Sequence, residues 1–418
     1  MPSCNVCDYG AIGDGVADNA GTLVQILALI GSKAIPVHVP AGSFVLNQDV
    51  VIPAHIPLHM DGQFVMAANH SLTIHGPIVA TRHQVFGGPG LVTCLSNVRQ
   101  TNYYPEWWGA DGTELAKTLV AIPTGATARL AHKTYTTTGA LQPTNRLLHI
   151  VGKGWGCLFV DGFGHPHWAT GPPVTGSVIK VTNVTDGLVF SANSTQHNHL
   201  EDFAILGPGT GTTSGLKYAA GPLGCGYHTH KRVGVFNFAT GWDVADVQDC
   251  VFDNVTARGC ITGVKASGIV TELYWRDPQL QANGVGMEWV GGSGLRVDGG
   301  LVQANSLGGI RIMGSMQSEI ARMWFEANAG QGFPGTFGIE INTTAGPITG
   351  LARVGNRMTD PVIFVGANTL NFLTMAWNHH PDALIIPANA VNTVLLNNNV
   401  GPVTDLGYRT TILGQYTS

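Results

Sequence analysis

The side chains best suited to chemistry are three carboxylates, Asp298, Glu319 and Glu326, which lie near the aromatic residues Tyr274 and Trp324 in the sequence. Hydrolysis of a glycosidic bond needs one carboxylic acid that protonates the leaving oxygen and one carboxylate that acts as base or nucleophile. The two groups stand about 5 Å apart in retaining enzymes and roughly 6.5–9.5 Å apart in inverting ones. The chain therefore holds the side-chain types that this reaction requires, provided that the fold brings them together.

Asparagine recurs at a fixed position in three short segments, and aligning the chain on it orders the candidates into columns. The aligned residues are Asn283, Asn305 and Asn328. The alignment gives one column of Tyr274, Arg296 and Glu319 and, two residues along, a column of Arg276, Asp298 and Ala321. Asp298 and Glu319 are then one strand and two residues apart, which strand geometry converts to about 8 Å. This separation suits an inverting pair.

The same columns allow a purely structural interpretation. In it, two ion pairs, Arg276–Asp298 and Arg296–Glu319, hold neighbouring strands together. A neighbouring cation lowers the pKa of a carboxyl and makes it a poor proton donor.

Glu326 has different neighbours. Its column contains Gln303 and Gln281 and no cation, and Trp324 lies two residues earlier on the same strand face. Such surroundings favour a raised carboxyl pKa, as a general acid requires. We therefore expect Glu326 to be the acid, with Asp298 or Glu319 as the base; the alternative is that Glu326 is a polar corner residue. The residues expected to bind the sugar are Tyr274, Arg276, Arg296 and Trp324.

A second candidate is the run from Tyr227 to Arg232, the densest set of bases in the chain. A polysaccharide lyase needs a base that removes the proton beside a uronate carboxyl and a cation that neutralises that carboxyl. His228, His230, Lys231 and Arg232 could supply both, although such a cluster is also typical of a solvated turn. No nucleophile elbow, phosphate-binding loop or zinc pattern appears, so no cofactor and no metal site are expected.

The elements that must position these residues are visible as an internal repeat of glycine, apolar, charged, apolar. Its first glycines are Gly215, Gly241, Gly263, Gly286, Gly309 and Gly338. The charged residues of successive units are Lys217, Asp243, Lys265, Glu288, Arg311 and Glu340, so the sign alternates at every step. Parallel strands stacked about 4.8 Å apart would place opposite charges side by side. The repeat therefore predicts an all-β fold, a right-handed parallel β-helix with at least two strand faces per coil.

The head of the chain adds a resemblance. Residues 10–18 read Gly-Ala-Ile-Gly-Asp-Gly-Val-Ala-Asp, a short amphipathic helix is predicted over 19–30, and Val39-Pro-Ala-Gly-Ser-Phe44 follows. This arrangement, with the later string Pro105-Glu-Trp-Trp-Gly-Ala-Asp-Gly, resembles the pectate-lyase-like superfamily and in particular phage tailspike depolymerases. The resemblance implies a helix-capped solenoid, homotrimers, and cleavage of a bacterial capsular or exopolysaccharide. Lysis by β-elimination and glycan binding without catalysis remain alternatives.

The same resemblance suggests three regions. They are an N-terminal capping subdomain over 1–104, the main β-helix over 105–400, and a C-terminal cap or tail over 401–418.

Composition restricts the partners and the location. A net charge of −5 and a pI of about 6.3 offer no basic stripe, so neither nucleic acid nor membrane insertion is expected. Seven cysteines at irregular spacings do not form a disulfide framework. The N-terminus lacks the charged and apolar regions of a signal peptide. The resemblance to tailspike depolymerases implies a location on a virion tail or outside the cell, with a bacterial surface polysaccharide as partner.

Overall fold

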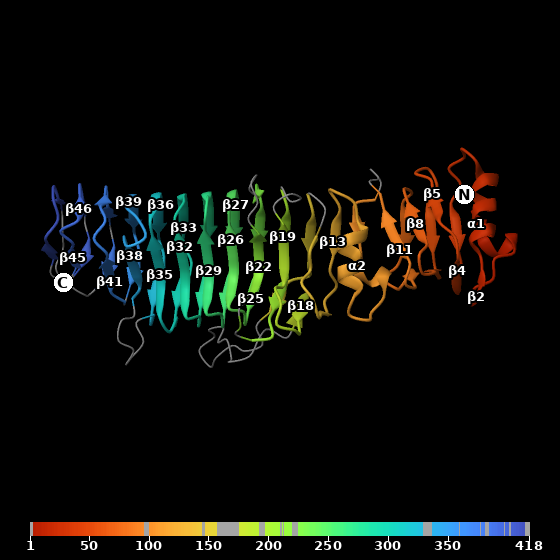
Figure 1. Cartoon of the computed structure of the whole chain (residues 1–418), viewed down its shortest axis with the longest axis horizontal. Helices are drawn as coiled ribbons and strands as arrows, with labels where there is room; N and C mark the ends of the chain where they lie inside the picture. The colour runs from red at the N-terminus through yellow and green to blue at the C-terminus, as the bar shows by residue number, and fades with distance from the viewer. Residues whose placement is uncertain are drawn as a thin grey trace.

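The computed structural model is a long rod in which the chain winds from α1 (Ala20–Ile30) at one end to the C-terminus at the other (Figure 1). The described residues are 3–95, 100–143, 147–156, 175–191, 197–209, 211, 213–219, 225–328, 337–358, 360–376, 378–380, 384–396, 398–400 and 403–413. Within them, the other helical elements are η1 (Val6–Tyr9), η2 (Pro105–Trp108) and α2 (Glu114–Ala121). The fold is the right-handed parallel β-helix that the repeat predicted.

Each coil of the main body contributes strands to three parallel sheets, which we call faces I, II and III in chain order. Face I consists of β12 (Asn102–Tyr103), β13 (Thr127–Arg129), β15 (His149–Val151), β20 (His199–Glu201), β24 (Thr229–Lys231), β27 (Val247–Asp253), β30 (Thr271–Arg276), β33 (Ser293–Asp298), β36 (Ser315–Ala321), β39 (Ile348–Val354), β43 (Thr374–Ala376), β47 (Val394–Leu396) and β50 (Thr411–Leu413), with β23 (Cys225–Gly226), β42 (Leu370–Asn371) and β46 (Ala390–Val391) beside them.

Face II follows face I after a short corner. It consists of β14 (Thr134–Thr137), β18 (Val178–Val181), β21 (Ala204–Leu206), β25 (Gly234–Phe236), β28 (Thr256–Arg258), β31 (Gln279–Gln281), β34 (Leu301–Gln303), β37 (Trp324–Glu326), β40 (Arg357–Met358), β44 (His379–His380) and β48 (Asn399–Val400).

Face III completes the coil. It consists of β19 (Leu188–Ser191), β22 (Ser214–Ala219), β26 (Thr240–Ala245), β29 (Thr262–Ser267), β32 (Val285–Val290), β35 (Gly308–Met313), β38 (Ile339–Asn342) and β41 (Val362–Val365). Two small pairs lie apart from the faces: the antiparallel β16 (Trp155–Gly156) and β17 (Thr175–Gly176), and the parallel β45 (Leu384–Ile386) and β49 (Val403–Asp405).

The N-terminal coils form three shorter parallel sheets beneath α1. Their strands are β1 (Cys4–Asn5), β3 (Val37–Val39), β6 (Leu58–Met60) and β9 (Ile78–Ala80); β2 (Asp14–Asp18), β4 (Ser43–Leu46), β7 (Gln63–Met66) and β10 (Phe86–Gly87); and β5 (Val50–Ile52), β8 (Ser71–Ile74) and β11 (Leu91–Cys94). Because α1 buries Leu23, Ile26 and Ile30 against the first coils, it covers the end of the core.

Strand register confirms the predicted columns of charge on face III. Lys217 lies opposite Asp243, Asp243 opposite Lys265, and Lys265 opposite Glu288. Arg311 then lies opposite Glu288 on one side and Glu340 on the other, and its guanidinium pairs with both carboxylates at 2.8 and 2.9 Å. The alternating residues point inward and form one continuous apolar core.

The asparagine column is a buried hydrogen-bonded ladder at the corner between faces II and III. The Asn305 amide donates to Asn328 Oδ1 at 2.7 Å and accepts from Asn283 at 3.1 Å, and the Asn328 amide donates to Asp360 Oδ2 at 2.8 Å. The left-handed bend of each corner falls on the residue before each asparagine, for example Ala304 at φ +53°. The asparagine side chains can therefore point inward and satisfy buried backbone groups.

The regional division stays a prediction, although one change of sheet lies near its first boundary. The N-terminal sheets end with β11, and face I begins with β12. Residues 401, 402 and 414–418 of the expected C-terminal cap lie outside the described part of the chain, whereas β49 and β50 extend the solenoid. Among the described residues, no helix is both long and apolar enough to cross a membrane.

Candidate active site

A column of bulged residues runs along face I and shapes its surface. It comprises Tyr227, Asp249, Glu272, Gly294, Gln317 and Gly350, all with φ between +50° and +75°. Register places them opposite one another, because the pairs Gln248↔Thr271 and Cys250↔Leu273 flank Asp249 and Glu272. Side chains in this conformation leave the regular alternation and point outward beside the next outward column. The bulge column therefore adds a second line of side chains along the face.

A shallow hollow of about 360 Å³ lies where this column reaches glycine. Its lining residues are Asp249, Cys250, Val251, Glu272, Leu273, Tyr274, Gly294 and Arg296. Gly294 lets the two strands approach closely beside Glu272, since a Cβ there would lie only 2.9 Å from the Glu272 nitrogen. The hollow thus brings together two carboxyls, one phenol and one guanidinium on adjacent strands.

Tyr274 sits between two guanidinium groups. The Cζ atoms of Arg276 and Arg296 lie 5.2 and 5.3 Å from its ring centroid. Its hydroxyl donates a hydrogen bond to Asp298 Oδ2 at 3.1 Å. These contacts fix the ring, as cation–π and charge-assisted hydrogen bonds do. Register confirms the predicted column of Tyr274, Arg296 and Glu319.

Asp298 is a buried carboxylate at the corner between faces I and II. It lies opposite Arg276 in the register, as predicted, but its ionic partner is Arg322, which the sequence did not suggest. The Arg322 guanidinium, and after it the Tyr274 hydroxyl, lower the pKa of Asp298. Arg276 pairs instead with Asp253 at 3.8 Å. Asp298 is therefore ionised at neutral pH and is not a proton donor.

Glu319 remains on the same face, two strands along from Tyr274. Its carboxylate lies 3.2 Å from Arg296 Nε, so the predicted ion pair between them is present. Both side chains stay partly exposed, at 36% and 55%. An ion-paired yet accessible carboxylate can accept a proton from water.

Glu326 and Trp324 lie on face II, on β37, and not on the face that carries Asp298 and Glu319. The Gln303 amide donates to Glu326 Oε2 at 3.1 Å, and the register with Gln303 is as predicted. Trp324 is 44% exposed, and the Arg357 guanidinium lies 4.7 Å from its ring centroid. The structure therefore does not bring Glu326 together with the other two candidate carboxylates. Trp324 lies nearer to them, because it follows the corner residue Arg322 by only two positions.

The histidines of the Tyr227–Arg232 run are not surface bases, so that expectation is wrong. His228 and His230 point into the core with 1% and 0% exposure and pack among aromatic rings. Burial lowers the pKa of His228 to about 3 and that of His230 well below its ordinary value. Arg232 is held by Asp202 at 2.6 Å and by Glu201 at 2.7 Å.

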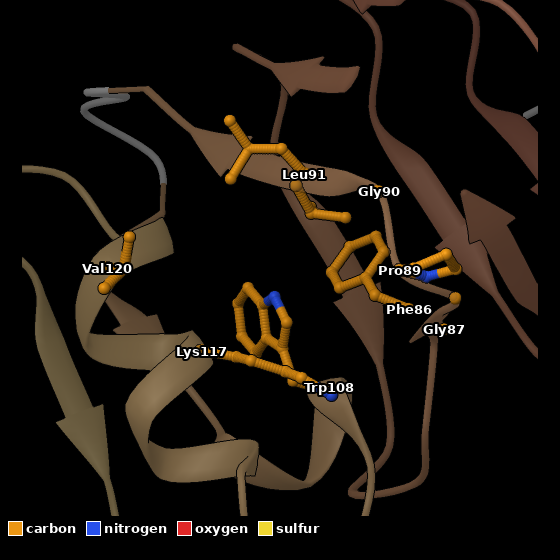
Figure 2. Close-up of a pocket in the computed structure, with 10 residues that line it drawn as sticks. Phe86, Gly87, Pro89, Gly90, Leu91, Trp108, Lys117 and Val120 are labelled. Atoms are coloured by element: carbon orange, nitrogen blue, oxygen red, sulfur yellow. The ribbon is translucent and has the colours of Figure 1, made fainter. Parts of the chain in front are cut away.

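A second pocket, of about 420 Å³, lies between the β10–β11 turn and α2 (Figure 2). Its wall consists of Phe86, Leu91, Trp108, Val120 and a glycine-rich turn, with Lys117 at the edge. None of its lining residues carries a carboxyl, so it offers no acid–base pair for hydrolysis. Elsewhere in the described part of the chain, no group of three His, Cys, Asp or Glu side chains could hold a metal ion.

Sequence reasoning missed Asp249, Gly294 and Arg322. Gly294 had a signal in the sequence, because it occupies the place one coil after Glu272, which lies two residues before Tyr274. The pattern used for the alignment gave no signal for Asp249 or Arg322. The left-handed backbone of Asp249 and Glu272 has no reliable signature, because residues other than glycine seldom adopt it and only Asp of the two acidic types is enriched there.

Comparisons with known proteins give a likeness of fold. No protein-family model matches the chain, and no curated protein matches it in sequence. The DFA-IIIase of Arthrobacter chlorophenolicus A6 without its lid is 14% identical, with a TM-score of 0.51, over 75% of this chain and 94% of that one. The same enzyme in another structure is 13% identical over 75% and 87%, with a TM-score of 0.51. The A-module of the Azotobacter vinelandii mannuronan C-5 epimerase AlgE4 is 12% identical over 100% of both chains, with a TM-score of 0.44.

Proposed function

We propose that the chain is a polysaccharide depolymerase that hydrolyses glycosidic bonds in the hollow on face I. The observation that carries this proposal is the stacking of Tyr274, Arg296 and Glu319 beside a hollow lined by Asp249 and Glu272. A polymer lying along the coils would meet a fixed aromatic ring, guanidinium donors and carboxylates in succession. Face I runs along the solenoid from β12 to β50, so a long polymer can lie along it.

Glu319 is the base in this proposal. Its carboxylate lies against Arg296, and its partial exposure leaves room for the attacking water. Asp298 acts through Tyr274, which it holds by the hydroxyl, because Arg322 and burial leave it little access to substrate. Tyr274, Arg276 and Arg296 bind sugar, and Trp324 extends the binding surface past the corner.

Hydrolysis is favoured over β-elimination because of how the cations on face I are paired. Each cation near the hollow has a carboxylate partner: Lys231 with Glu201, Arg276 with Asp253, Arg296 with Glu319 and Arg322 with Asp298. A lyase needs a cation that is free to neutralise a uronate carboxyl. The pairing also favours a sugar without charge at the cleavage point.

The substrate class and setting belong to the same proposal. We place the activity on a bacterial capsular or exopolysaccharide, in a homotrimeric spike of tailspike type that acts on a virion tail or outside the cell. The resemblance of the N-terminal motifs supports this setting. The DFA-IIIase that shares the fold is an enzyme by name, in keeping with an active site on such a scaffold.

A panel of purified capsular polysaccharides and exopolysaccharides, neutral and anionic, tests the proposal. Release of reducing ends without new ultraviolet absorbance is the expected result. Reducing ends accompanied by a conjugated double bond would mean elimination, and binding without either product would mean a non-catalytic adhesin. Glu319→Gln serves as the matched variant, which should bind the same polysaccharide but release reducing ends at least about a hundredfold more slowly.

A further inference from the structure

Hydrolysis in the hollow requires a proton donor besides Asp298 and the proposed base Glu319. Arg322 lowers the pKa of Asp298, and Glu319, as the base, accepts a proton rather than giving one. A carboxyl kept ionised has no proton to give to the leaving oxygen. The donor must be a carboxyl without a cationic partner that reaches the same hollow.

We propose that Glu272, sharing a proton with Asp249 on the preceding coil, is the general acid of this site. The inference rests on the proposed function and adds to it the residue that protonates the leaving group. Glu326, which the sequence pattern favoured for this role, lies on face II.

The geometry that supports the assignment is the meeting of two consecutive bulges. Asp249 and Glu272 occupy opposite positions on β27 and β30, with φ of +52° and +53°. Both line the hollow. Two carboxyls at facing positions of one hollow repel each other when both are ionised, so the pair holds a proton to higher pH than a lone carboxyl does.

The surroundings of the pair do not cancel this effect. The charged and titratable side chains on the outer face of β27, β30 and β33 are Asp253, Tyr274, Arg276, Arg296 and Asp298, besides the pair itself. Each of the two arginines has another carboxylate partner, Asp253 for Arg276 and Glu319 for Arg296. In agreement with the geometry, the hydrogen bond and the charge of Asp249 raise the pKa of Glu272.

The position of Glu272 relative to Glu319 suits an acid–base pair. The two lie two strands and two residues apart, about 12 Å between backbone positions by strand geometry. Glu272 lines the hollow and Glu319 lies against Arg296, another lining residue, so side-chain reach can shorten this toward the roughly 6.5–9.5 Å of an inverting enzyme. Gly294 keeps the space beside Glu272 free of side-chain atoms.

The proposed reaction is an ordinary hydrolysis of the glycosidic bond. Glu272 gives its proton to the glycosidic oxygen while the bond from that oxygen to the anomeric carbon breaks, and the bonding electrons stay with the oxygen. Water gives a proton to Glu319, and its oxygen forms the new bond to the anomeric carbon. Exchange with solvent returns both carboxyls to their starting states, so the net change is one water added across the bond.

Titration of the carboxyl itself tests the shared proton without reference to activity. Protein labelled with ¹³C at the glutamate side-chain carboxyl is followed by NMR against pH, and the Glu272 signal is assigned by its loss in Glu272→Gln. Glu272 should titrate above about 4.3, the ordinary value for a glutamate. In Asp249→Asn it should return to the ordinary range. A Glu272 that titrates normally in the unaltered protein would overturn the shared proton.

Kinetics test the catalytic role, with the panel polysaccharide that the unaltered chain hydrolyses as substrate. Glu272→Gln should lower kcat at least about a hundredfold with little change in KM, and Asp249→Asn should move the alkaline limb of the pH–rate profile to lower pH. Glu326→Gln is the matched comparison and should stay near the unaltered rate. A large loss of kcat in Glu326→Gln with little loss in Glu272→Gln would instead assign the acid to Glu326 on face II. If the unaltered chain hydrolyses nothing, the proposed function and the donor role fail together, whereas the titration still decides whether the pair shares a proton.

Discussion

Gly294 lies opposite Glu272 on the neighbouring coil, so close that a Cβ on Gly294 would stand 2.9 Å from the Glu272 nitrogen. At Gly294 the column lacks a side chain between Glu272 and Gln317, and the hollow on face I lies at this position. The line of left-handed residues along face I thus shapes the surface at which we propose that substrate binds.

Replacing this glycine should abolish the hollow. Gly294→Ala places a methyl group against Glu272 and forces a non-glycine residue to φ +71°. We expect depolymerisation to fall at least tenfold and the free energy of unfolding to fall by about 1–2 kcal/mol. Urea unfolding and reducing-end assays measure the two effects.

Gly350→Ala supplies the control for strain alone. Gly350 belongs to the same column at φ +74°, but its nearest neighbours are atoms of Gln317 at 3.4 Å, away from the hollow. Gly350→Ala should lower the free energy of unfolding by a similar amount and leave the rate of depolymerisation unchanged. Equal loss of activity in both variants would mean that the hollow is not where substrate binds.

Tyr274 should matter more for its ring than for its hydroxyl. Tyr274→Phe removes the hydrogen bond to Asp298, which Arg322 still holds, and should cost about 1 kcal/mol of unfolding free energy. Tyr274→Ala also removes the ring between Arg276 and Arg296, and should raise KM more than the phenylalanine variant does. Equal KM values for both variants in the reducing-end assay would contradict a sugar-binding role for the ring.

Much of the scaffold could be predicted because its signals repeat. The alternating charges from Lys217 to Glu340 and the asparagines from Asn283 to Asn328 fix the register of successive coils, and register alone placed Tyr274, Arg296 and Glu319 in one column. The aligned columns predict where a residue lies along its coil, but they do not predict the angle between neighbouring faces of the coil.

The angle between faces is why part of the site could not be foreseen. The chain turns a corner at Arg322, which separates Glu326 from Glu319 although few residues lie between them. The same corner gives Asp298 a partner from a turn rather than from its own column. Corner conformations depend on left-handed residues such as Arg322 at φ +54°, for which side-chain type is a weak guide.

The charge column of face III should contribute unequally to stability. Arg311 pairs with Glu288 and with Glu340, whose side chain is only 7% exposed, so Arg311→Met leaves a buried carboxylate without its cation. We expect a loss of about 3 kcal/mol in unfolding free energy. Lys217→Met is the matched variant, because Lys217 is 36% exposed and 3.4 Å from Asp186, and should cost less than about 1 kcal/mol. Equal losses measured by urea unfolding would show that burial does not decide the contribution.

The buried histidines should make the solenoid sensitive to acid. His228 and His230 are neutral in the folded chain, since burial holds the pKa of His228 at about 3 and that of His230 well below its usual value. In the unfolded chain both have a pKa of about 6.5. As pH falls below about 6.5, the unfolded state takes up protons that the folded state does not, so the unfolding free energy decreases with falling pH. For His228 this continues until pH reaches about 3.

Urea unfolding between pH 7 and pH 5 measures this decrease in a range where most carboxyls stay ionised. Each histidine contributes up to about 1.4 kcal/mol per pH unit below its unfolded pKa. His228→Phe keeps an aromatic ring beside Tyr218, at the cost of the hydrogen bond that the Asn198 nitrogen donates to His228 Nδ1. It should therefore be less stable at pH 7 yet show a smaller decrease toward pH 5. His132→Gln changes an exposed histidine and should leave the decrease as it is. A stability that is flat with pH in the unaltered protein would mean that the two histidines are hydrated or paired in solution.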